Sequence, residues 1–536
     1  PTIAELSQVI ELSQRSAALP PIVPIERTAE LPLSYAQQRL WFLQQLDPKN
    51  SSYSMPAGFS VKGELAIESL ERAFSTLVER HEVLRSRFES VDGNAHVLID
   101  ATSGWELERE DISDLPVDEQ SEIIRRDAVE MIGYQFDLEQ GPLFKVRLIY
   151  QGPDLAVLLI NMHHIISDGW SIGVLVQELI QLYLAYQQDL PNPLPALPIQ
   201  YVDYAHWQRH YLTGAVLDEQ LDYWRNNLSG APSLLHLPTD HPRPPVQSFR
   251  GALAEIKIEA RLVTQLKELA RGNDATLFMV LLAGYQLLLS RYSQQTDINV
   301  GIPIAGRNRR ELESLIGFFI NAAVIRTQLS GNLSKGELLE RVKEVTLGAY
   351  AHQDVPAEML LDALQVERNL SYGPLAQVGF ALQNIPIERQ GISLEGLTIE
   401  PLEYEHVTAK YDLTLLLSEQ DDQLIGAAEY ATDLFEATTI ERFLTHYLRI
   451  LEWLVESPAE ASLSQLELVT PDELYAELEV DSAAIERIEP LTAMQRDLYL
   501  ASELDPETLQ NSLGYAVELH SELDVDRWVA ELTRFS

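Results

Sequence analysis

The residues of this chain whose types and spacing best suit chemistry lie in one short segment, residues 163–169, which reads HHIISDG. Two adjacent histidines are followed, after three intervening residues, by an aspartate and a glycine, and an apolar run at residues 155–160 precedes them. Titratable side chains are costly to place at the end of an apolar strand, so this cluster indicates function. A histidine here can act as a general base or hydrogen-bond partner near neutral pH. The chemistry it suggests is acyl transfer, in which the histidine takes a proton from the incoming nucleophile or stabilises charge at a tetrahedral centre.

The spacing within this segment assigns a different task to each residue. Neighbours in a strand point to opposite faces, so if the strand continues to His163 only one histidine faces a given cleft, and His164 is the better candidate. Asp168 could hold the loop by pairing with an arginine elsewhere, Gly169 allows a tight backbone with an exposed N–H, and Ser171 can cap the following helix. The alternative for a histidine pair is a satisfied core feature or half of a metal site. We expect no metal, because adjacent histidines point apart and no other His, Asp or Glu cluster has ligand spacing.

Composition and charge narrow the class of protein. The chain has 536 residues, 46% of them hydrophobic, and a net charge of −42, which suits two or three lobes and a surface that repels nucleic acid and anionic lipid. It has no cysteine, which excludes disulfides, thiolate metal sites and a cysteine nucleophile and fits a cytoplasmic protein. No signal peptide is visible at residues 1–14, and the most apolar window, residues 276–289, falls short of a bilayer span.

Hydrophobic periodicity predicts interleaved helices and strands, and therefore an α/β or α+β fold. Two proline-rich breaks, at residues 191–198 and 238–245, suggest two lobes at about 25–200 and 201–470. The helices are expected at residues 67–81, 118–131, 171–188, 260–273, 276–292 and 438–456. The strands are expected at residues 57–62, 144–149, 155–162, 297–304, 322–328 and 411–418.

An internal repeat links the two ends of the chain. Residues 33–48 align without a gap on residues 491–506, and two shorter blocks downstream of each also match. The chain therefore begins a second copy of its own first domain, although coincidence over one helix is the simpler alternative. The tail from Pro471 holds sixteen Asp and Glu residues against four Arg and no Lys, so it must pack on the body or stay loose.

Seven motifs in a fixed order carry a resemblance to a known family. Residues 163–169 match the HHxxxDG motif of the condensation domain of nonribosomal peptide synthetases, which the chain resembles from about Leu33 to about Leu466. The other six matching motifs lie at residues 34–42, 80–88, 201–208, 316–321, 352–356 and 368–375.

The resemblance implies a fold, a reaction and roles for residues. The fold is two chloramphenicol-acetyltransferase-like lobes in a V-shaped pseudo-dimer, with the active site between them. A donor aminoacyl or peptidyl thioester and an acceptor aminoacyl thioester arrive on phosphopantetheine arms of an upstream and a downstream carrier protein, and an amide bond joins them; the chain itself binds no cofactor. His164 matches the catalytic histidine, as base or as the group that positions the amine, and Gly169 matches the glycine beside the tetrahedral oxygen. His163 and Asp168 match structural residues of the site, with Asp168 paired to an arginine that matches Arg307.

Other positions of the motifs refine or qualify the resemblance. The opening motif and the residues from Ser167 to Ser171 look like the subgroup that joins two L-residues. Three positions are smaller than is usual in the family, either by drift with compensating packing or because a channel is widened. The candidates for lining the substrate channel are Ser171, Asn321, Ala322, Ala357 and Ala376. The other motif histidines, His81, His206 and His352, are expected to be structural.

The resemblance also divides the chain and leaves two alternatives open. We expect the last helix of a preceding carrier protein at residues 1–14, a linker at 15–29, an N-lobe at 30–200, a C-lobe at 201–470, and a linker with a truncated second condensation-like domain at 471–536. Adjacent synthetase domains are the expected partners, with neither nucleic acid nor membrane. The alternatives are a catalytically silent platform for carriers or tailoring enzymes, and another acyl transfer such as ester formation.

Overall fold

The computed structural model describes residues 20–27, 30–46, 53–101, 105–366, 369–383, 392–394, 396–402 and 408–470. The chain divides into two compact units, Pro1–Leu468 and Val469–Ser536, and all but the start of the second lies outside the described residues. The carrier-type helix expected at residues 1–14, both ends of the linker at 15–29 and the repeat at 491–506 also lie outside them. The helices and strands of the described residues all belong to the first unit.

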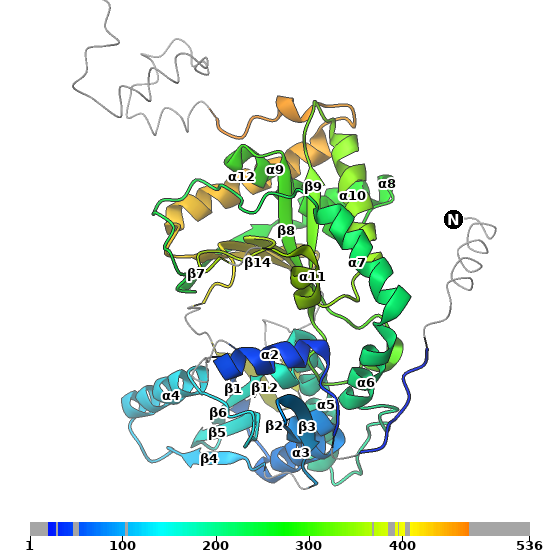
Figure 1. Ribbon diagram of the computed structural model, residues 1–536. Helices are drawn as coiled ribbons and strands as arrows, with labels where there is room; N and C mark the ends of the chain where they lie inside the picture. The colour runs from blue at the N-terminus through cyan, green and yellow to red at the C-terminus, as the bar shows by residue number, and fades with distance from the viewer. Residues whose placement is uncertain are drawn as a thin grey trace, which may run out of the picture. The chain divides into compact units, whose positions relative to one another are not determined.

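A six-stranded sheet built around β6 (Leu155–His163) forms the first half of this unit (Figure 1). β6 runs antiparallel to β1 (Ser54–Gly63) and to β5 (Phe144–Gly152). Both of its faces are buried, which explains why its sequence is a continuous apolar run rather than an alternating one. The sheet is completed by β4 (Glu108–Asp111), β12 (Leu397–Pro401) and β11 (Ile392–Leu394) in the order β11-β12-β1-β6-β5-β4.

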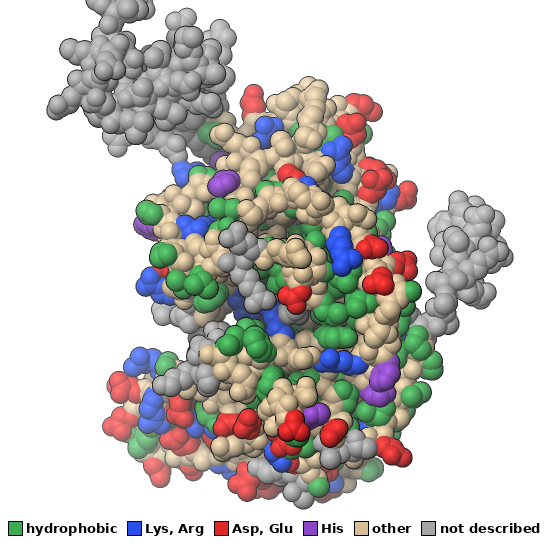
Figure 2. Space-filling model, in the orientation of Figure 1, with side chains coloured by type: hydrophobic (Ala, Val, Ile, Leu, Met, Phe, Trp, Pro, Cys, Tyr) green, Lys and Arg blue, Asp and Glu red, His purple; other side chains and the backbone are tan. Residues whose placement is uncertain are grey.

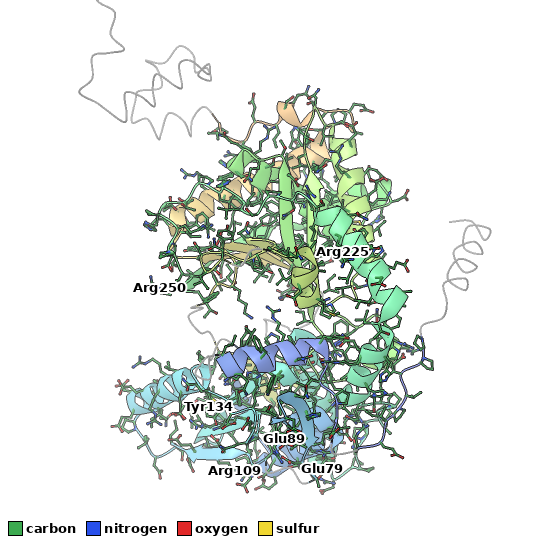
Figure 3. All side chains as sticks on the ribbon, viewed as in Figure 1. Glu79, Glu89, Arg109, Tyr134, Arg225 and Arg250 are labelled. Atoms are coloured by element: carbon green, nitrogen blue, oxygen red, sulfur yellow. The ribbon has the colours of Figure 1, made fainter. Side chains whose placement is uncertain are left out.

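Helices cover the two faces of this first sheet. Leu158 and Ile160 of β6 share a core with α3 (Ile67–Arg80) and α5 (Gly169–Gln187). Val157 and Leu159, which point the other way, pack with Met131 of α4. The remaining elements of this half are α2 (Tyr35–Leu46), α4 (Val117–Ile132), the short helix η1 (Glu82–Arg85) and the hairpin β2 (Ser86–Val91) with β3 (Asn94–Ile99). On the face drawn in Figure 2, acidic side chains are frequent over this half, and Glu79, Glu89 and Arg109 lie at its outer edge in Figure 3.

A second six-stranded sheet forms the other half, with α9 (Leu277–Ser293) at the centre of its core. Nearly every residue of α9 from Met279 to Leu289 is buried, so its apolar window belongs to a core helix. Figure 1 shows α9, α10 (Lys335–Ala351) and α12 (Ala437–Glu456) gathered on one side of the sheet. The strand order is β7 (Gly251–Ile258), β14 (Gln423–Ala431), β13 (Leu413–Gln420), β10 (Val378–Gln383), β8 (Asp297–Ile304) and β9 (Asn321–Gln328). The other helices are α6 (Tyr201–Tyr211), α7 (Gly214–Leu228), α8 (Ala260–Gly272), α11 (Ala357–Leu364) and the short turns η3 (Arg310–Leu312) and η4 (Leu463–Gln465).

The six helices and six strands expected from periodicity are confirmed, each to within three residues at either end. Residues 191–198 and 238–245 form neither helix nor strand, as the proline-rich breaks predict. Within the described ranges no single helix is long and apolar enough to cross a membrane. The consecutive helices α8 and α9 meet such a criterion only when taken together, and they are bent by 103° at the break between them.

The chain does not divide into lobes as simply as residues 30–200 and 201–470. Strand β12 pairs with β1, from Phe59 opposite Pro401 to Gly63 opposite Leu397, so a hairpin from the second half completes the first sheet. An unpaired β1 edge would leave backbone N–H and C=O groups open to other chains, and the hairpin covers it. Residues 312–319 also belong to the first core. The first crossing lies beside the start of β6, and the second brings residues 312–319 to its end at His163.

Candidate active site

The end of β6 holds the two histidines in a fixed turn. β6 ends at His163, and residues 164–166 form the single turn η2 (His164–Ile166) before α5 begins at Gly169. The backbone N–H of His164 donates to the Tyr53 carbonyl at 2.7 Å, and that of His163 donates to the Leu143 carbonyl at 3.0 Å. Strands on either side of β6 therefore fix the backbone from which the imidazoles project.

His163 faces the interior of the first core. It is 2% exposed, and its ring lies 6.0 Å from the ring of Phe136. Its Nδ1 accepts a hydrogen bond from the backbone N–H of Ile165 at 3.0 Å, so the neutral ring carries its proton on Nε2. Burial first, and the neighbouring His164 second, lower the pKa of His163 to about 3. His163 is thus a neutral group that shapes the turn and faces away from solvent.

His164 has the opposite tautomer and a different environment. Its ring is half-buried, and its Nδ1 lies 2.8 Å from the Ser167 carbonyl oxygen. A carbonyl can only accept, so Nδ1 carries the proton and Nε2 presents a lone pair. Burial and the charge of Lys410 lower the pKa of His164, against the Ser167 carbonyl and Asp168, which raise it. His164 therefore offers a neutral imidazole with Nε2 as an acceptor, which is the state a general base requires.

Asp168 joins the turn to a buried polar network. Its Oδ1 accepts from the backbone N–H and the hydroxyl of Ser171, at 2.8 and 2.7 Å, and its Oδ2 accepts from the Phe319 N–H at 2.9 Å. Arg307 donates from Nη2 to Asp168 at 3.2 Å and to the Ser171 hydroxyl at 2.8 Å, and the two charged side chains are 1% and 2% exposed. Asp168 and Arg307, which the family resemblance pairs, are therefore in contact in the structure.

The expectation that Ser171 caps α5 is wrong. Asp168 is the N-cap residue, and Ser171 lies at the third helical position, where its backbone N–H is the donor. A carboxylate on an extended residue is well placed to accept from that amide, so it displaces the serine from the role. Gly169 is the first residue of α5, and its N–H has no acceptor within the helix. It lies at the positive end of the helix dipole.

Residues 312–319, which we call the clamped segment, are held against this network. The Ser171 hydroxyl accepts from the Gly317 N–H at 3.0 Å, and the Tyr201 hydroxyl donates to the Phe318 carbonyl at 2.6 Å. Gly317 has to be glycine, because a Cβ there would lie 2.0 Å from the Tyr201 ring. The ring of Phe318 lies 4.8 Å from that of His164, at an interplanar angle of 63°. A segment from the second half of the chain therefore forms part of the wall around His164.

Three further hydrogen bonds anchor the clamped segment and its surroundings. The Nδ1 of His81 accepts a hydrogen bond from the Ile316 N–H at 3.5 Å. Its Nε2 lies 2.7 Å from a carboxylate oxygen of Glu178. Ser34 approaches the Tyr201 hydroxyl at 2.8 Å. These contacts give His81, which the sequence marks only as structural, a place beneath the site.

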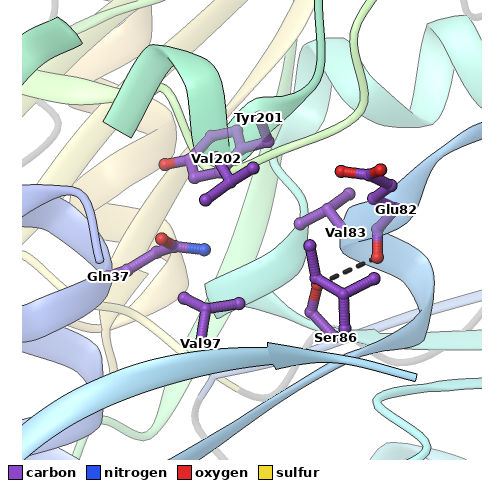
Figure 4. A pocket seen from close by; sticks show the side chains of 8 residues that line it. Gln37, Glu82, Val83, Ser86, Val97, Tyr201 and Val202 are labelled. Carbon is purple, nitrogen blue, oxygen red and sulfur yellow. Dashed lines mark hydrogen bonds between the residues drawn. The ribbon is translucent and has the colours of Figure 1, made fainter. Parts of the chain in front are cut away.

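A small cavity lies behind the turn (Figure 4). Gln37 connects it to the site, because its amide donates to the Ile165 carbonyl at 3.1 Å. The cavity has room for about one water molecule and does not include His164, so it is no substrate site. Its lining residues are Gln37, Glu82, Val83, Ser86, Val97, Ile99, Tyr201 and Val202.

The five residues expected to line a substrate channel have different environments. Ser171 is fully buried inside the Asp168 network, and the Asn321 amide donates to the carbonyls of Gln353 and Val355 at 2.9 and 2.7 Å. The polar groups of both are already bonded within the protein, so a channel role for Ser171 is wrong and Asn321 holds a loop. The three alanines come from different elements: Ala322 is exposed on β9, Ala357 is half-buried at the start of α11, and Ala376 is 5% exposed.

Lys410 is a charged neighbour of His164 that the motifs do not indicate. It lies in the lead-in to β13, and its charge lowers the pKa of His164. The side chain is exposed to solvent, yet the surrounding protein lowers its own pKa, as does the charge of Arg39, against Glu429. Among the described residues no group of three or more His, Asp or Glu side chains could hold a metal ion.

Comparisons with known proteins agree with this geometry. A sequence profile of the family described as Condensation domain matches residues 27–477. One protein of the linear gramicidin synthase of Brevibacillus parabrevis is 45% identical over 476 residues, which cover 88% of this chain and 9% of that protein. Another protein of the same synthase is 43% identical over 531 residues, 98% of this chain and 10% of that protein. The chain thus spans about a tenth of the length of these relatives.

Solved structures show the same fold. The X-domain from teicoplanin biosynthesis superposes with a TM-score of 0.74 at 26% identity, over 84% of this chain and all of that one. The condensation domain from the Monacolin K polyketide synthase MokA gives a TM-score of 0.69 at 22% identity, over 81% of this chain and 99% of that one. The mixed helix-and-sheet, acetyltransferase-like fold is confirmed, while the V-shaped arrangement stays a prediction. The order of motifs, the site at the end of β6 and these matches together show that the chain belongs to the condensation-domain family of nonribosomal peptide synthetases.

Proposed function

We propose that this chain forms an amide bond between a donor aminoacyl or peptidyl thioester and an acceptor aminoacyl amine, each carried on the phosphopantetheine arm of a partner carrier protein. The observation that carries the proposal is the bonding of His164, whose Nδ1 donates to the Ser167 carbonyl at 2.8 Å and leaves Nε2 as an acceptor. Such a group can take a proton from an amine at neutral pH.

Each step of the reaction requires a group that takes or gives the proton or that binds the developing negative charge. The acceptor nitrogen attacks the thioester carbonyl, a C–N bond forms, and Nε2 of His164 takes the proton that the nitrogen loses. The C–S bond then breaks, and the same proton goes to the leaving thiolate. The N–H of Gly169, at the start of α5, is suited to bind the developing oxyanion, because a helix N-terminus favours negative charge. If His164 instead only positions the amine, the same nitrogen accepts the amine's hydrogen bond.

Three residues act through His164 rather than on the substrate. His163 holds the Ile165 N–H, and Asp168 holds both the start of α5 and the clamped segment. Arg307 neutralises the Asp168 charge inside the core. We assign all three as positioning residues, because their polar atoms make contacts within the protein.

The finer assignments belong to the same proposal. The opening motif supports an L-donor and L-acceptor subgroup, and the absence of cysteine supports a cytoplasmic location. The division into residues 1–14, 15–29, 30–200, 201–470 and 471–536 is supported by a relative that aligns over 98% of the chain. The crossings of β11–β12 and the clamped segment qualify the boundary between the two lobes.

A silent platform is the second candidate, because the similar X-domain has been solved in a complex with OxyB. The acceptor geometry at His164 favours catalysis over this role, and ester formation differs from amide formation only in the nucleophile.

The test is dipeptide formation by the purified chain with two separately loaded carrier proteins. We expect His164→Ala to lose about 10² to 10⁴-fold in rate while its thermal midpoint stays close to that of the wild type. His96→Ala, a half-buried histidine on β3, is the matched control and should keep full activity. Wild-type rates from His164→Ala would overturn the proposal. Product from a carrier loaded with a hydroxyacyl acceptor, and none from one loaded with an aminoacyl acceptor, would indicate ester formation.

A further inference from the structure

The ring of Phe318 is an aromatic contact of His164 that comes from the second half of the chain. The two rings meet edge to face, with centroids 4.8 Å apart and planes at 63°, a favoured aromatic geometry. Phe318 is 8% exposed and otherwise packs in the first core. The contact therefore joins a residue of the clamped segment to the reacting imidazole.

The position of Phe318 is fixed through its backbone and its neighbours. Its carbonyl accepts from the Tyr201 hydroxyl at 2.6 Å. The N–H groups of Gly317 and Phe319, on either side, donate to Ser171 at 3.0 Å and to Asp168 at 2.9 Å. Three consecutive residues are thus pinned by α5, its N-cap and α6, so the Phe318 ring can act as a fixed stop.

His164 needs such a stop. Its Nδ1 bond to the Ser167 carbonyl fixes one point of the ring, and Nε2 must stay free to meet the substrate. A five-membered ring held at one edge can tip about that point, and tipping moves Nε2 away from the reacting atoms. A rigid aromatic ring packed against the imidazole restricts that tipping.

We infer that Phe318 is a positioning residue, which fixes the orientation of the His164 ring and so links the clamped segment to the reaction. The inference rests on the proposed function of His164. Phe318 touches the imidazole and needs no contact with the substrate. The charged and titratable groups around His164 are Lys410 before β13, Asp168 in its own turn and His163 on β6. A change at Phe318 leaves all three in place.

The test compares the variants Phe318→Leu and Phe74→Leu. Phe74 is a buried phenylalanine of the same core, and its ring packs on Trp105 and Phe144. Both variants lose a buried ring, so similar falls in thermal midpoint are expected. Only Phe318→Leu should lose about tenfold or more in the single-turnover rate of dipeptide formation, with the apparent KM for the acceptor carrier unchanged. Phe318→Tyr keeps the ring and should restore the rate to within about threefold of the wild type.

A second readout separates this inference from the proposed function. The ring resonances of His164, assigned by their loss in His164→Ala, should shift or broaden in Phe318→Leu and stay sharp in Phe74→Leu. Equal rates for the two leucine variants, or unchanged His164 resonances, would overturn the inference. Full activity of His164→Ala would instead overturn the proposed function, whatever Phe318→Leu does to the resonances.

Discussion

Two sets of buried polar groups, one around the start of α5 and one in the second core, are organised in opposite ways. Around the start of α5, Asp168 and Ser171 each make three or more hydrogen bonds, and Tyr201 bonds to two residues. In the second core the hydroxyls of Tyr285 and Thr327 have no hydrogen-bond partner among the described residues, although both residues are fully buried. A connected network fixes its members in one arrangement, whereas isolated groups are merely tolerated by packing.

This difference indicates that the surroundings of His164 are the part of the molecule organised for chemistry. Connected groups hold the His164 turn and the clamped segment in one place before any substrate arrives, which is how a preorganised site lowers a barrier. Even there two nitrogens, His163 Nε2 and Arg307 Nε, find no partner among the described residues. The second core supplies the frame that carries β11, β12 and the clamped segment to the first.

The largest expected effect breaks the network at Asp168. Asp168→Asn keeps the shape of the side chain but leaves the Arg307 guanidinium buried without a counter-charge, so we expect a loss of about 3–5 kcal/mol in the free energy of unfolding. Urea titration of the wild type, Asp168→Asn, Arg307→Gln and the double variant measures it. The two single effects should not add, because each breaks the same pair. Additive effects, or an unchanged urea midpoint for Asp168→Asn, would contradict the pairing.

Acid should weaken the first core through His163. The pKa of this histidine is about 3 in the folded protein and near 6.5 when unfolded, so the unfolded state binds the extra proton between these values. Its contribution to stability is complete above pH 6.5 and is lost as the pH falls. Between about pH 5.5 and 4 it should add a slope of about 1.4 kcal/mol per pH unit. His163→Asn, whose side-chain oxygen can still accept from the Ile165 N–H, should flatten the slope; an equal slope in both proteins would refute this explanation.

The smallest effect sharpens the comparison with one matched pair of tyrosines. Tyr201→Phe removes a hydroxyl that bonds Ser34 and the Phe318 carbonyl, and should cost about 1–3 kcal/mol of unfolding free energy. Tyr285→Phe removes a buried hydroxyl without a partner among the described residues, and should be neutral or stabilise by up to about 1 kcal/mol. Chemical denaturation of both variants measures the two free energies of unfolding. Similar losses at the two sites would mean that the two cores do not differ in this way.

The sequence predicts what is local or carried by a motif. Hydrophobic periodicity predicts α3 and α12, and a continuous apolar run predicts β6. The motif at residues 163–169 together with the family resemblance predicts the meeting of Asp168 and Arg307. The Ser171 cap was misassigned because α5 begins at Gly169, two residues earlier than expected, so the preceding Asp168 is the N-cap.

Contacts between distant parts of the chain could not be predicted in this way. Tyr201 and Phe318 are 117 residues apart, and His81 and Ile316 are 235 apart, so no periodicity records that these pairs meet. Nor does any pattern show that β12 crosses to pair with β1. Lys410 was missed because a lone lysine before a strand is ordinarily a surface residue. Only the folded arrangement shows that these distant residues meet.

The adjacent histidines hold opposite tautomers, so that only His164 offers a nitrogen to the substrate, and this claim is central to the proposed function. Nitrogen NMR of imidazole-labelled protein at neutral pH tests it directly, with His163→Asn and His164→Ala used to assign the two rings. We predict that His164 is protonated on Nδ1 with a free Nε2, and that His163 is protonated on Nε2. A His164 ring that is cationic, or that carries its proton on Nε2, would contradict the claim.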